Sequence, residues 1–347
     1  MRNKIIFAVA VICFLILGTV GYYGYALFDF GKDIQKDKDD SPFKPIYEET
    51  PEPVYVPPEW EGKERVNILL LGGDSRNLSE YEVPRSDAIL LASIDPVTKS
   101  AQLFSILRDT YVEIPGHGMN RINSALALGG PELAMETVGR LLDLPIQYYF
   151  YVDFEGFIAL IDAIGGIDFY VEKDMKYTDI TDKEEYQIDL KQGMQHLDGN
   201  KALQYVRFRH DALSDYARTE RQRNFMQAVF KKLKSTYSLI RLPATLDKIK
   251  PYIETNMSVG KMLELATLSY RIDLDKLQDA QLPPPELLRE ETINGAAVIT
   301  VDPPALREFV QRTLEQAAAA AAKDGTDAGA AGKDGGNTAG DAGDEPN

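Results

Sequence analysis

Arginines gather in one short stretch of this chain, and arginine is well suited to binding phosphate. The stretch runs from Tyr205 to Arg223 and reads YVRFRHDALSDYARTERQR. Its first part alternates apolar and basic residues, which predicts a strand with Arg207 and Arg209 on one face. A guanidinium group keeps its charge and binds phosphate oxygens through two parallel hydrogen bonds. The stretch therefore suggests a site for a di- or polyanion.

The second part of the stretch predicts a helix that carries further polar side chains on one face. Arg218, Arg221 and Gln222 recur at three- and four-residue spacing, after Asp and Ser residues suited to turns and N-caps. A solvated basic face with local ion pairs is the alternative, and it is the commoner outcome for an isolated charge run. Because the chain has a net charge of -16 and still concentrates arginine here, an anion site is the better interpretation.

Two aspartates lie at the boundaries of neighbouring predicted strands. Val66–Leu71 is a continuous apolar run typical of a buried central strand, and the sequence GGDSR, which holds Asp74 and Arg76, follows it directly. Loops at such strand ends often bind ligands. The next predicted strand begins at Asp87. The two carboxylates could share a Mg²⁺ ion, which favours a few carboxylates with phosphate oxygens completing its shell.

Arg108 ends a third predicted strand and could face the same place. For each of these charged residues alone, an ordinary strand-end charge is the simpler interpretation. Together they form acidic metal ligands beside an arginine cluster, an arrangement suited to electrostatic catalysis of phosphoryl transfer. The chain has no Walker A loop, no G-x-G-x-x-G motif and no metal-binding histidine spacing. Ser75 and Ser86 lack a plausible partner base, which argues against a serine hydrolase.

Strands and helices interleave along the part of the chain that must position these residues. Strands are predicted for residues 66–71, 87–94, 101–107, 148–152, 167–171 and 297–301. Helices are predicted for residues 131–142, 154–164, 243–249, 259–270 and 304–316, besides the arginine-bearing helix. This order predicts an α/β domain over residues 65–316, with a mixed sheet in a three-layer α/β/α sandwich.

The uncharged apolar segment Ile5–Leu27 predicts a transmembrane helix, because it is long enough to cross a bilayer. Basic residues within residues 1–4 and aspartates beyond the segment predict a cytoplasmic N-terminus and an extracellular C-terminal domain. A cleaved signal peptide is the alternative. No small-residue cleavage pattern follows the apolar run, and Gly21–Leu27 is typical of an interfacial aromatic belt. We therefore favour an uncleaved signal anchor and a single-pass protein of the cell membrane.

The composition predicts the character of the remaining segments and argues against some kinds of partner. Residues 28–64 are rich in Asp, Glu, Lys and Pro, which predicts an extended stalk, and the Ala/Gly/Asp-rich residues 317–347 predict a disordered tail. The acidic balance argues against general nucleic-acid binding. The single cysteine, Cys13, excludes an intrachain disulfide and a Cys-based metal site. An exported domain without disulfides weakly favours a Gram-positive cell surface.

Several ordered motifs resemble the LytR-CpsA-Psr family of cell-envelope proteins. The matching blocks read NILLLGGDSR, RSDAILLASIDP, SILRDTYVEIPG, RINSALALGG, DFEGFIALIDAIGGID, HLDGNKALQYVRFRHD and DYARTERQR. They cover roughly Val66–Lys234. Leu107 departs from the pattern, since the family usually has proline before the Arg-Asp pair. The polar stretch Tyr177–Tyr186 also lies outside the pattern.

The resemblance implies a phosphotransferase that depends on Mg²⁺, or on Mn²⁺ in its place. Such an enzyme moves wall teichoic acid, capsule or a similar polymer from a polyprenyl-pyrophosphate carrier to peptidoglycan. The acceptor would be the C6 hydroxyl of N-acetylmuramic acid, and polyprenyl phosphate would leave. The family's fold also implies an apolar cleft between sheet and helices for the lipid tail. The partners implied are therefore the lipid-linked glycopolymer, peptidoglycan and the membrane, without nucleic acid.

Carried over by position, the resemblance also assigns roles to residues of this chain. Asp74 and Asp87 would hold the metal. The general base is left unassigned, with Asp87 and Asp215 as candidates. The catalytic residues would be Asp74, Asp87, Arg108, Arg207 and Arg209. The residues that would bind the pyrophosphate are Arg76, Arg108, Arg207, Arg209, Arg218, Arg221 and Gln222.

Two other functions stay open at this point. One is a non-catalytic sensor or regulator of envelope synthesis that binds polyprenyl-linked lipids. The other is a pyrophosphatase that uses the same site with water as the acceptor. A hydrolase and a ligase need the same charge clamp, so the sequence does not separate them.

Overall fold

A six-stranded mixed sheet forms the centre of the protein. The computed structural model describes residues 21–36, 39–49, 55–74, 82–178, 187–209, 214–233, 235–270 and 277–330. In spatial order the strands are β11 (Ile253–Thr255), β6 (Tyr148–Asp153), β1 (Val66–Gly73), β2 (Ser86–Asp95), β3 (Ser100–Ile106) and β12 (Gln278–Leu282). The strand β1 is parallel to β6 and antiparallel to β2, and β3 is parallel to β12. The predicted α/β fold with a mixed central sheet is confirmed.

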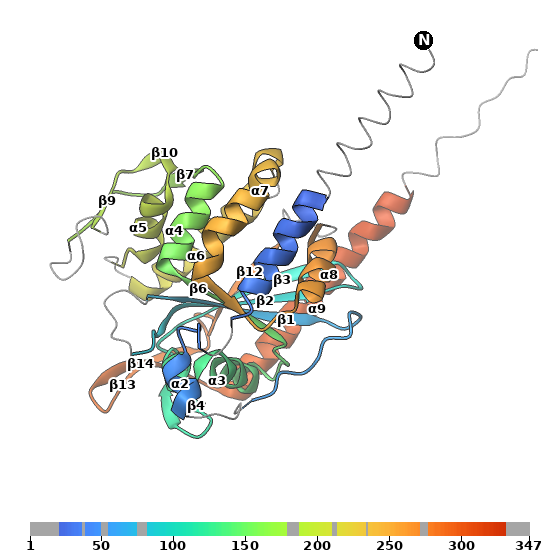
Figure 1. Ribbon diagram of the computed structural model, residues 1–347. Helices are drawn as coiled ribbons and strands as arrows, with labels where there is room; N and C mark the ends of the chain where they lie inside the picture. The colour runs from blue at the N-terminus through green and yellow to red at the C-terminus, as the bar shows by residue number, and fades with distance from the viewer. Residues whose placement is uncertain are drawn as a thin grey trace, which may run out of the picture.

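Helices cover both faces of this sheet (Figure 1). One face carries α2 (Lys44–Glu49), α3 (Ser124–Leu142) and α9 (Pro303–Ala330). The other face carries α4 (Phe154–Ala163), α5 (Gly199–Arg207), α6 (Ser214–Leu233), α7 (Thr236–Ile249) and α8 (Val259–Tyr270). The 3₁₀ turn Lys250–Tyr252 follows α7. The layers agree with the sandwich that the sequence predicted.

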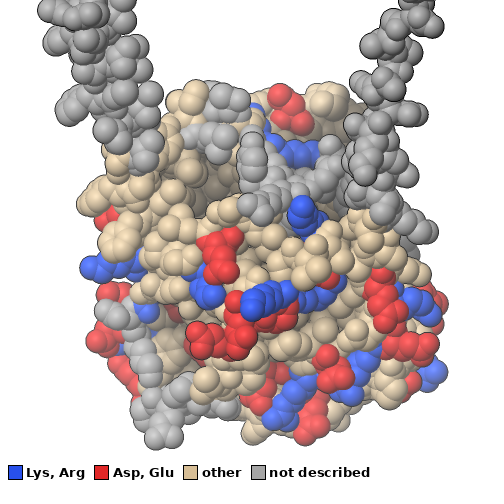
Figure 2. All heavy atoms as spheres, turned by 90° about the vertical axis from the view of Figure 1, so that its right-hand side faces the viewer, with Lys and Arg blue, Asp and Glu red and all other residues tan. Residues whose placement is uncertain are grey.

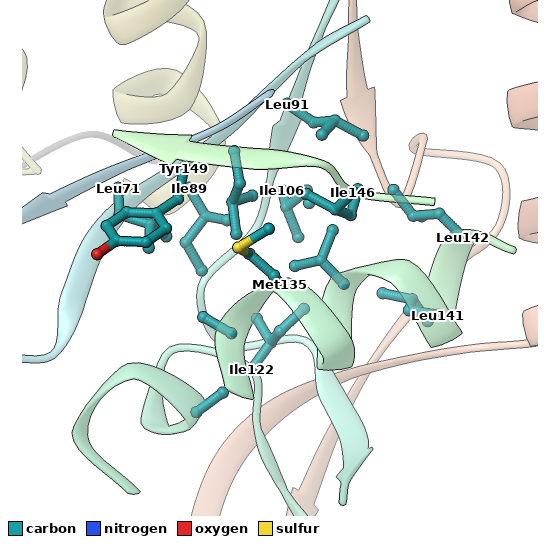
Figure 3. Packing of buried hydrophobic residues seen from close by; sticks show 14 of the residues in the cluster. Leu71, Ile89, Leu91, Ile106, Ile122, Met135, Leu141, Leu142, Ile146 and Tyr149 are labelled. Carbon is teal, nitrogen blue, oxygen red and sulfur yellow. The ribbon is translucent and has the colours of Figure 1, made fainter. Parts of the chain in front are cut away.

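Burial on both faces explains why β1 reads as an unbroken apolar run. Successive side chains of a strand point to opposite faces. Leu69 and Leu71 therefore join the core beneath α3, whereas Ile68 belongs to the core on the other side. Figure 3 shows Met135 and Leu142 of α3 directed at the sheet from below. Strands buried on both faces lack the alternation of half-exposed strands.

Among the described residues, four two-stranded sheets lie beside the central sheet. They are β4 (Tyr111–Ile114) with β5 (Gly118–Arg121), β7 (Ile167–Val171) with β10 (Gly193–Leu197), β8 (Met175–Tyr177) with β9 (Ile188–Leu190), and β13 (Leu288–Ile293) with β14 (Ala296–Val301). On the face that Figure 2 displays, the acidic and basic side chains of the described residues are interspersed.

The segment predicted as an extended stalk instead packs against the domain. Residues 21–33 are helical, and Ile34, Phe43 and Trp60 are fully or almost fully buried. Ser41 donates a 2.8 Å hydrogen bond to the carboxylate of Glu254 in β11. The prediction of a stalk over residues 28–64 is therefore wrong. A few apolar residues between charged ones are enough to hold the segment against the domain. The average composition of the segment does not reveal them.

Two further expectations about secondary structure are corrected. Tyr205–Arg209 is the end of α5 followed by an extended Phe208, rather than a strand. The side chains of Ala202, Leu203 and Tyr205 form the buried face of α5, a helical spacing that the short alternation obscured. The helix α9 continues to Ala330, where a disordered tail was predicted from residue 317, and the alanine run over residues 317–322 favours a helix there. Residues 331–347 of the predicted tail lie outside the described residues.

In the parts of the chain that the structure describes, no helix is both long and apolar enough to cross a membrane. The predicted transmembrane segment, residues 5–27, lies mostly outside those parts. Its C-terminal end is within the helix over residues 21–33.

Replacing Phe43 by alanine should destabilise the whole domain. The ring is fully buried and packs edge-on against Tyr151, with centroids 5.0 Å apart. Loss of a buried phenylalanine costs about 3–5 kcal/mol, whereas Val56→Ala, at a 77% exposed position nearby, should change little. Urea denaturation measures both. Equal stability of Phe43→Ala and wild type would restore the stalk interpretation.

The buried carboxyl of Glu254 should make stability depend on pH. Burial raises its pKa above 4.5, against the opposing effects of hydrogen bonds from Ser41 and Tyr149 and the charge of Lys36. A raised folded-state pKa means that its stabilising contribution is lost as pH rises through that pKa. Glu254→Gln should therefore gain unfolding free energy relative to wild type between about pH 4 and 7. A difference that stays constant across urea titrations at these pH values would contradict this.

Candidate active site

A cavity of about 450 Å³ lies between the sheet and helices α4, α5 and α6. It brings together most of the residues that the sequence singled out. The polar residues that line it are Asp74, Asp87, Arg108, Arg207, Arg209, Arg218 and Gln222. Four arginines against two aspartates make its polar part cationic in a chain of net charge -16.

Adjacent strands bring the two aspartates to the cavity. Asp74 directly follows β1, and Asp87 is the second residue of β2. Gly73 pairs with Ser86 after a register shift between Gly72 and Gly73, so the aspartates leave neighbouring strands at the same edge. Gly73 is required here, because a Cβ would lie 2.7 Å from the ring of Tyr151. Burial raises the pKa of Tyr151, and the carboxylates of Asp153 and Asp74 raise it further.

Asp87 holds two arginines from distant parts of the chain. Its Oδ1 accepts hydrogen bonds from Arg108 Nη1 at 2.5 Å and from Arg209 Nη2 at 3.3 Å. Asp109 lies 3.6 Å from Arg108 Nε and 3.3 Å from Arg121 Nη1. These carboxylates offset the repulsion between like charges at the cavity wall. The guanidinium groups are thereby positioned before any ligand arrives.

The helix α5 presents Arg207 at its C-terminal end. Asp198 begins the helix by accepting a hydrogen bond from the backbone N–H of Lys201. A cation in the last turn is favoured by the helix dipole. The Arg207 guanidinium lies 5.4 Å from the ring centroid of Phe154 at the start of α4, a cation–π contact. Gly199 allows the close approach of the two helices, since a Cβ would meet the Ile158 carbonyl oxygen at 2.4 Å.

The helix α6 lines the cavity with a face that changes from polar to apolar. Arg218 is only 2% exposed, and Gln222 follows one turn later on the same face. Phe225 and Met226 continue that face and also line the cavity. A buried cation is costly to desolvate, and Arg218 places such a charge in the wall of the cavity.

Arg221 lies behind the cavity instead of lining it. Its side chain is 5% exposed, and its Nη2 donates a 2.5 Å hydrogen bond to the Phe208 carbonyl. Nη1 donates to Glu172 at 3.2 Å, and the guanidinium lies over the Phe208 ring at 5.3 Å. Arg221 therefore fixes the backbone that precedes Arg209. Its predicted contact with pyrophosphate is replaced by a positioning role.

The apolar residues that line the cavity were not identified from the sequence. Sequence reasoning anticipated an apolar cleft between sheet and helices without naming its walls. The residues are Leu70, Leu71, Ala88, Leu90, Val152, Phe154, Phe157, Leu160, Tyr177, Ile188, Leu203, Val206, Phe225 and Met226. The helical spacing of Gln222, Phe225 and Met226 was a usable signal. Tyr177 and Ile188 lie between the recognised motifs, and no signal in the sequence indicated that they line a cavity.

The donors in the cavity fit a magnesium ion only together with a ligand. Asp74 and Asp87 both reach the cavity, and Mg²⁺ is commonly bound by one or two carboxylates plus substrate phosphates. Among the described residues, no three His, Cys, Asp or Glu side chains are grouped to hold a metal by themselves. Arg76 lies outside the described residues, and so does the side chain of Asp215.

Together the fold and cavity define a protein that can hold an anionic headgroup joined to an apolar chain. The model of the LytR_cpsA_psr family matches residues 29–315, and the chain belongs to this family. The resemblance inferred from the motifs is confirmed. The match also begins within the segment that had been predicted as a stalk.

Relatives of known name and structure agree with this assignment. The polyisoprenyl-teichoic acid–peptidoglycan teichoic acid transferase TagU of Bacillus cereus is 34% identical over 294 residues, covering 82% of this chain and 88% of that protein. The crystal structure of B. subtilis TagV matches with 27% identity and a TM-score of 0.61, covering 74% of this chain and 98% of that one. A structure of TagT, also a B. subtilis protein, holds octaprenyl pyrophosphate lipid. It matches with 26% identity and a TM-score of 0.56, covering 77% and 96% of the two chains.

Replacing Arg221 by methionine should lower the free energy of unfolding more than replacing Arg209, an arginine that lines the cavity. The substitution leaves the Phe208 carbonyl without its donor, which costs about 1–3 kcal/mol. Arg209→Ala is the matched comparison, because that side chain is 40% exposed and should affect stability less. Urea denaturation of both variants measures the difference. An Arg221→Met protein as stable as wild type would show that Arg221 does not hold Phe208.

Proposed function

We propose that this protein is a membrane-anchored phosphotransferase that joins an anionic glycopolymer to peptidoglycan. The donor is the polymer on a polyprenyl-pyrophosphate carrier, and the acceptor is the C6 hydroxyl of N-acetylmuramic acid. One observation carries the proposal: a single cavity combines four arginines and two aspartates with an apolar interior. That combination matches a diphosphate attached to a prenyl chain.

The cavity accounts for the recognition of both parts of the carrier. Arg207, Arg209 and Arg218 would bind the diphosphate oxygens, with Arg108 and Gln222 beside them. Guanidinium–phosphate pairs are bidentate and strong, particularly where water is excluded. The prenyl chain would lie along the apolar faces of α5 and α6, away from water. Burial of each CH₂ group stabilises binding by about 0.8 kcal/mol.

The transfer step breaks one phosphorus–oxygen bond and forms another. The acceptor hydroxyl oxygen attacks the phosphorus that carries the glycopolymer, and the bond to the bridging oxygen of the diphosphate breaks. Polyprenyl phosphate leaves with that oxygen and its negative charge, and a phosphodiester remains on peptidoglycan. The hydroxyl proton is released to a base. In a loose transition state, stabilisation of charge on the phosphate oxygens by arginines contributes most.

Asp74 and Asp87 would hold Mg²⁺ together with oxygens of the diphosphate. When bound, the ion would neutralise part of the phosphate charge. Asp87 also serves the site through its bonds to Arg108 and Arg209. The carboxylate thus links the metal position to the arginine cluster.

The predicted N-terminal anchor, residues 5–27, suits this function, because the carrier lipid is confined to a membrane. We propose a single-pass topology with the catalytic domain on the extracellular side. Teichoic acid transfer in the name of TagU and the prenyl lipid in the TagT structure support the choice of substrate.

The test uses the full chain in detergent with Mg²⁺, a polyprenyl-pyrophosphate-linked saccharide and a peptidoglycan oligomer. Mass spectrometry should detect saccharide phosphate joined to the oligomer. The product should disappear with a chelator and in Asp74→Ala. Free saccharide phosphate alone would indicate a pyrophosphatase. Lipid that binds but stays intact would indicate a sensor, provided that a known transferase is active in the same assay.

Single arginine substitutions should separate catalysis from general charge. Arg207→Ala and Arg209→Ala should each cost about 2–4 kcal/mol of transition-state stabilisation, or about 30- to 1000-fold in turnover. Arg140→Ala is the control, because Arg140 is 64% exposed on α3 across the sheet and also pairs with a glutamate. Unchanged turnover in both cavity variants would rule out the arginine clamp.

A further inference from the structure

The helix over residues 21–33 is fixed rigidly to the domain. Leu27, Phe30 and Ile34 pack against apolar side chains of α7, β11 and α8. Lys250 forms ion pairs with Asp29 at 3.0 Å and with Asp33 at 2.9 Å. These contacts leave little freedom between this helix and α7, beside which it lies in Figure 1.

One hydrogen bond fixes the helix over residues 21–33 to the first turns of α7. It therefore sets the level of α7 relative to the proposed anchor. Tyr23 Oη donates to the carbonyl of Ile240 at 2.8 Å. Crossing a hydrocarbon core of about 30 Å takes roughly 20 helical residues, so an anchor beginning at Ile5 reaches the outer interface near residue 24. With the proposed anchor, Ile240 would lie at the depth of the lipid headgroups.

The exposed side chains at this level suit a lipid interface. Tyr22, Tyr25 and Phe28 are 59%, 68% and 59% exposed and follow one another along one side of the helix. Tyrosine is enriched at the headgroup level of membranes. Ile240 is 67% exposed although it is apolar. Both elements therefore present apolar surface where the bilayer would cover it.

Basic residues lie at the C-terminal end of α6 and in the first half of α7, near Ile240 in the sequence. Lys231 and Lys232 lie in the last turn of α6, and Arg241 directly follows Ile240. Lys231 and Arg241 are exposed. Cations beside an exposed apolar residue suit a surface that is apolar within and anionic at its boundary, as an anionic membrane is.

We propose that this α6–α7 corner, formed by Lys231, Lys232, Ile240 and Arg241, is a second membrane contact that binds anionic phospholipid headgroups. The proposal rests on the proposed anchor but is independent of the transfer reaction. A second contact beside the anchor would limit tilting of the domain relative to the membrane plane. The helix α6, which lines the cavity, would then keep a constant orientation toward the membrane that holds the prenyl carrier.

The test measures how deeply a dye attached to one residue lies in the membrane, with the full chain reconstituted in vesicles. Cys13→Ser removes the native thiol, and an environment-sensitive dye is attached at Ile240→Cys. Met119→Cys is the matched control, because Met119 is also exposed and lies in β5, whose partner β4 is at the opposite end of the molecule in Figure 1. Vesicles contain phosphatidylcholine with or without phosphatidylglycerol, and headgroup-region quenchers are included.

The dye at Ile240 should be quenched several-fold more than the dye at Met119, and more strongly with phosphatidylglycerol. Changing Lys231, Lys232 and Arg241 to glutamine should remove that dependence while transferase turnover in detergent persists. Equal quenching at both positions would overturn the contact. Quenching that is the same with and without phosphatidylglycerol would contradict the proposed binding of anionic headgroups. Flotation of the vesicles tests the anchor separately, and a chain that does not float would overturn both.

Discussion

The shared ion pairs of Asp87 are the interaction on which the site depends. Four arginines line one cavity, and their charges repel one another in a region of reduced dielectric. Asp87 binds Arg108 from the end of β3 and Arg209 from the segment after α5, so one carboxylate joins two separate parts of the chain. Without such a counter-charge the arginines would turn toward solvent. A ligand diphosphate can reinforce this arrangement because it brings further negative charge.

The rest of the structure serves to hold that cluster against an apolar space. The two-sided core fixes β1 and β2, which carry the aspartates, and α6 fixes the segment after α5 through Arg221 and the Phe208 carbonyl. The same α6 supplies Phe225 and Met226 to the apolar wall. Displacing α6 would therefore change headgroup binding and lipid binding together. This coupling is expected where one ligand has a charged and an apolar part.

The N-terminal segment packs against the domain and connects it to the proposed membrane anchor. Its buried residues and its bond to Glu254 make it part of the domain, and the helix over residues 21–33 is held by α7 and α8. A flexible stalk would let the cavity face any direction. A packed segment instead couples the orientation of the domain to that of the proposed anchor.

The sequence by itself determined the family, the mixed α/β architecture and most of the polar residues that meet in the cavity. Long motifs and continuous apolar runs such as Val66–Leu71 carry that information locally. Only the tertiary structure decided that Arg221 contacts Phe208 instead of lining the cavity, and that Phe43 and Trp60 are buried. Arg218 and Arg221 lie three residues apart on α6, yet only Arg218 lines the cavity, because the two side chains point in different directions. Burial of isolated apolar residues likewise depends on surfaces contributed by distant segments, which no local pattern encodes.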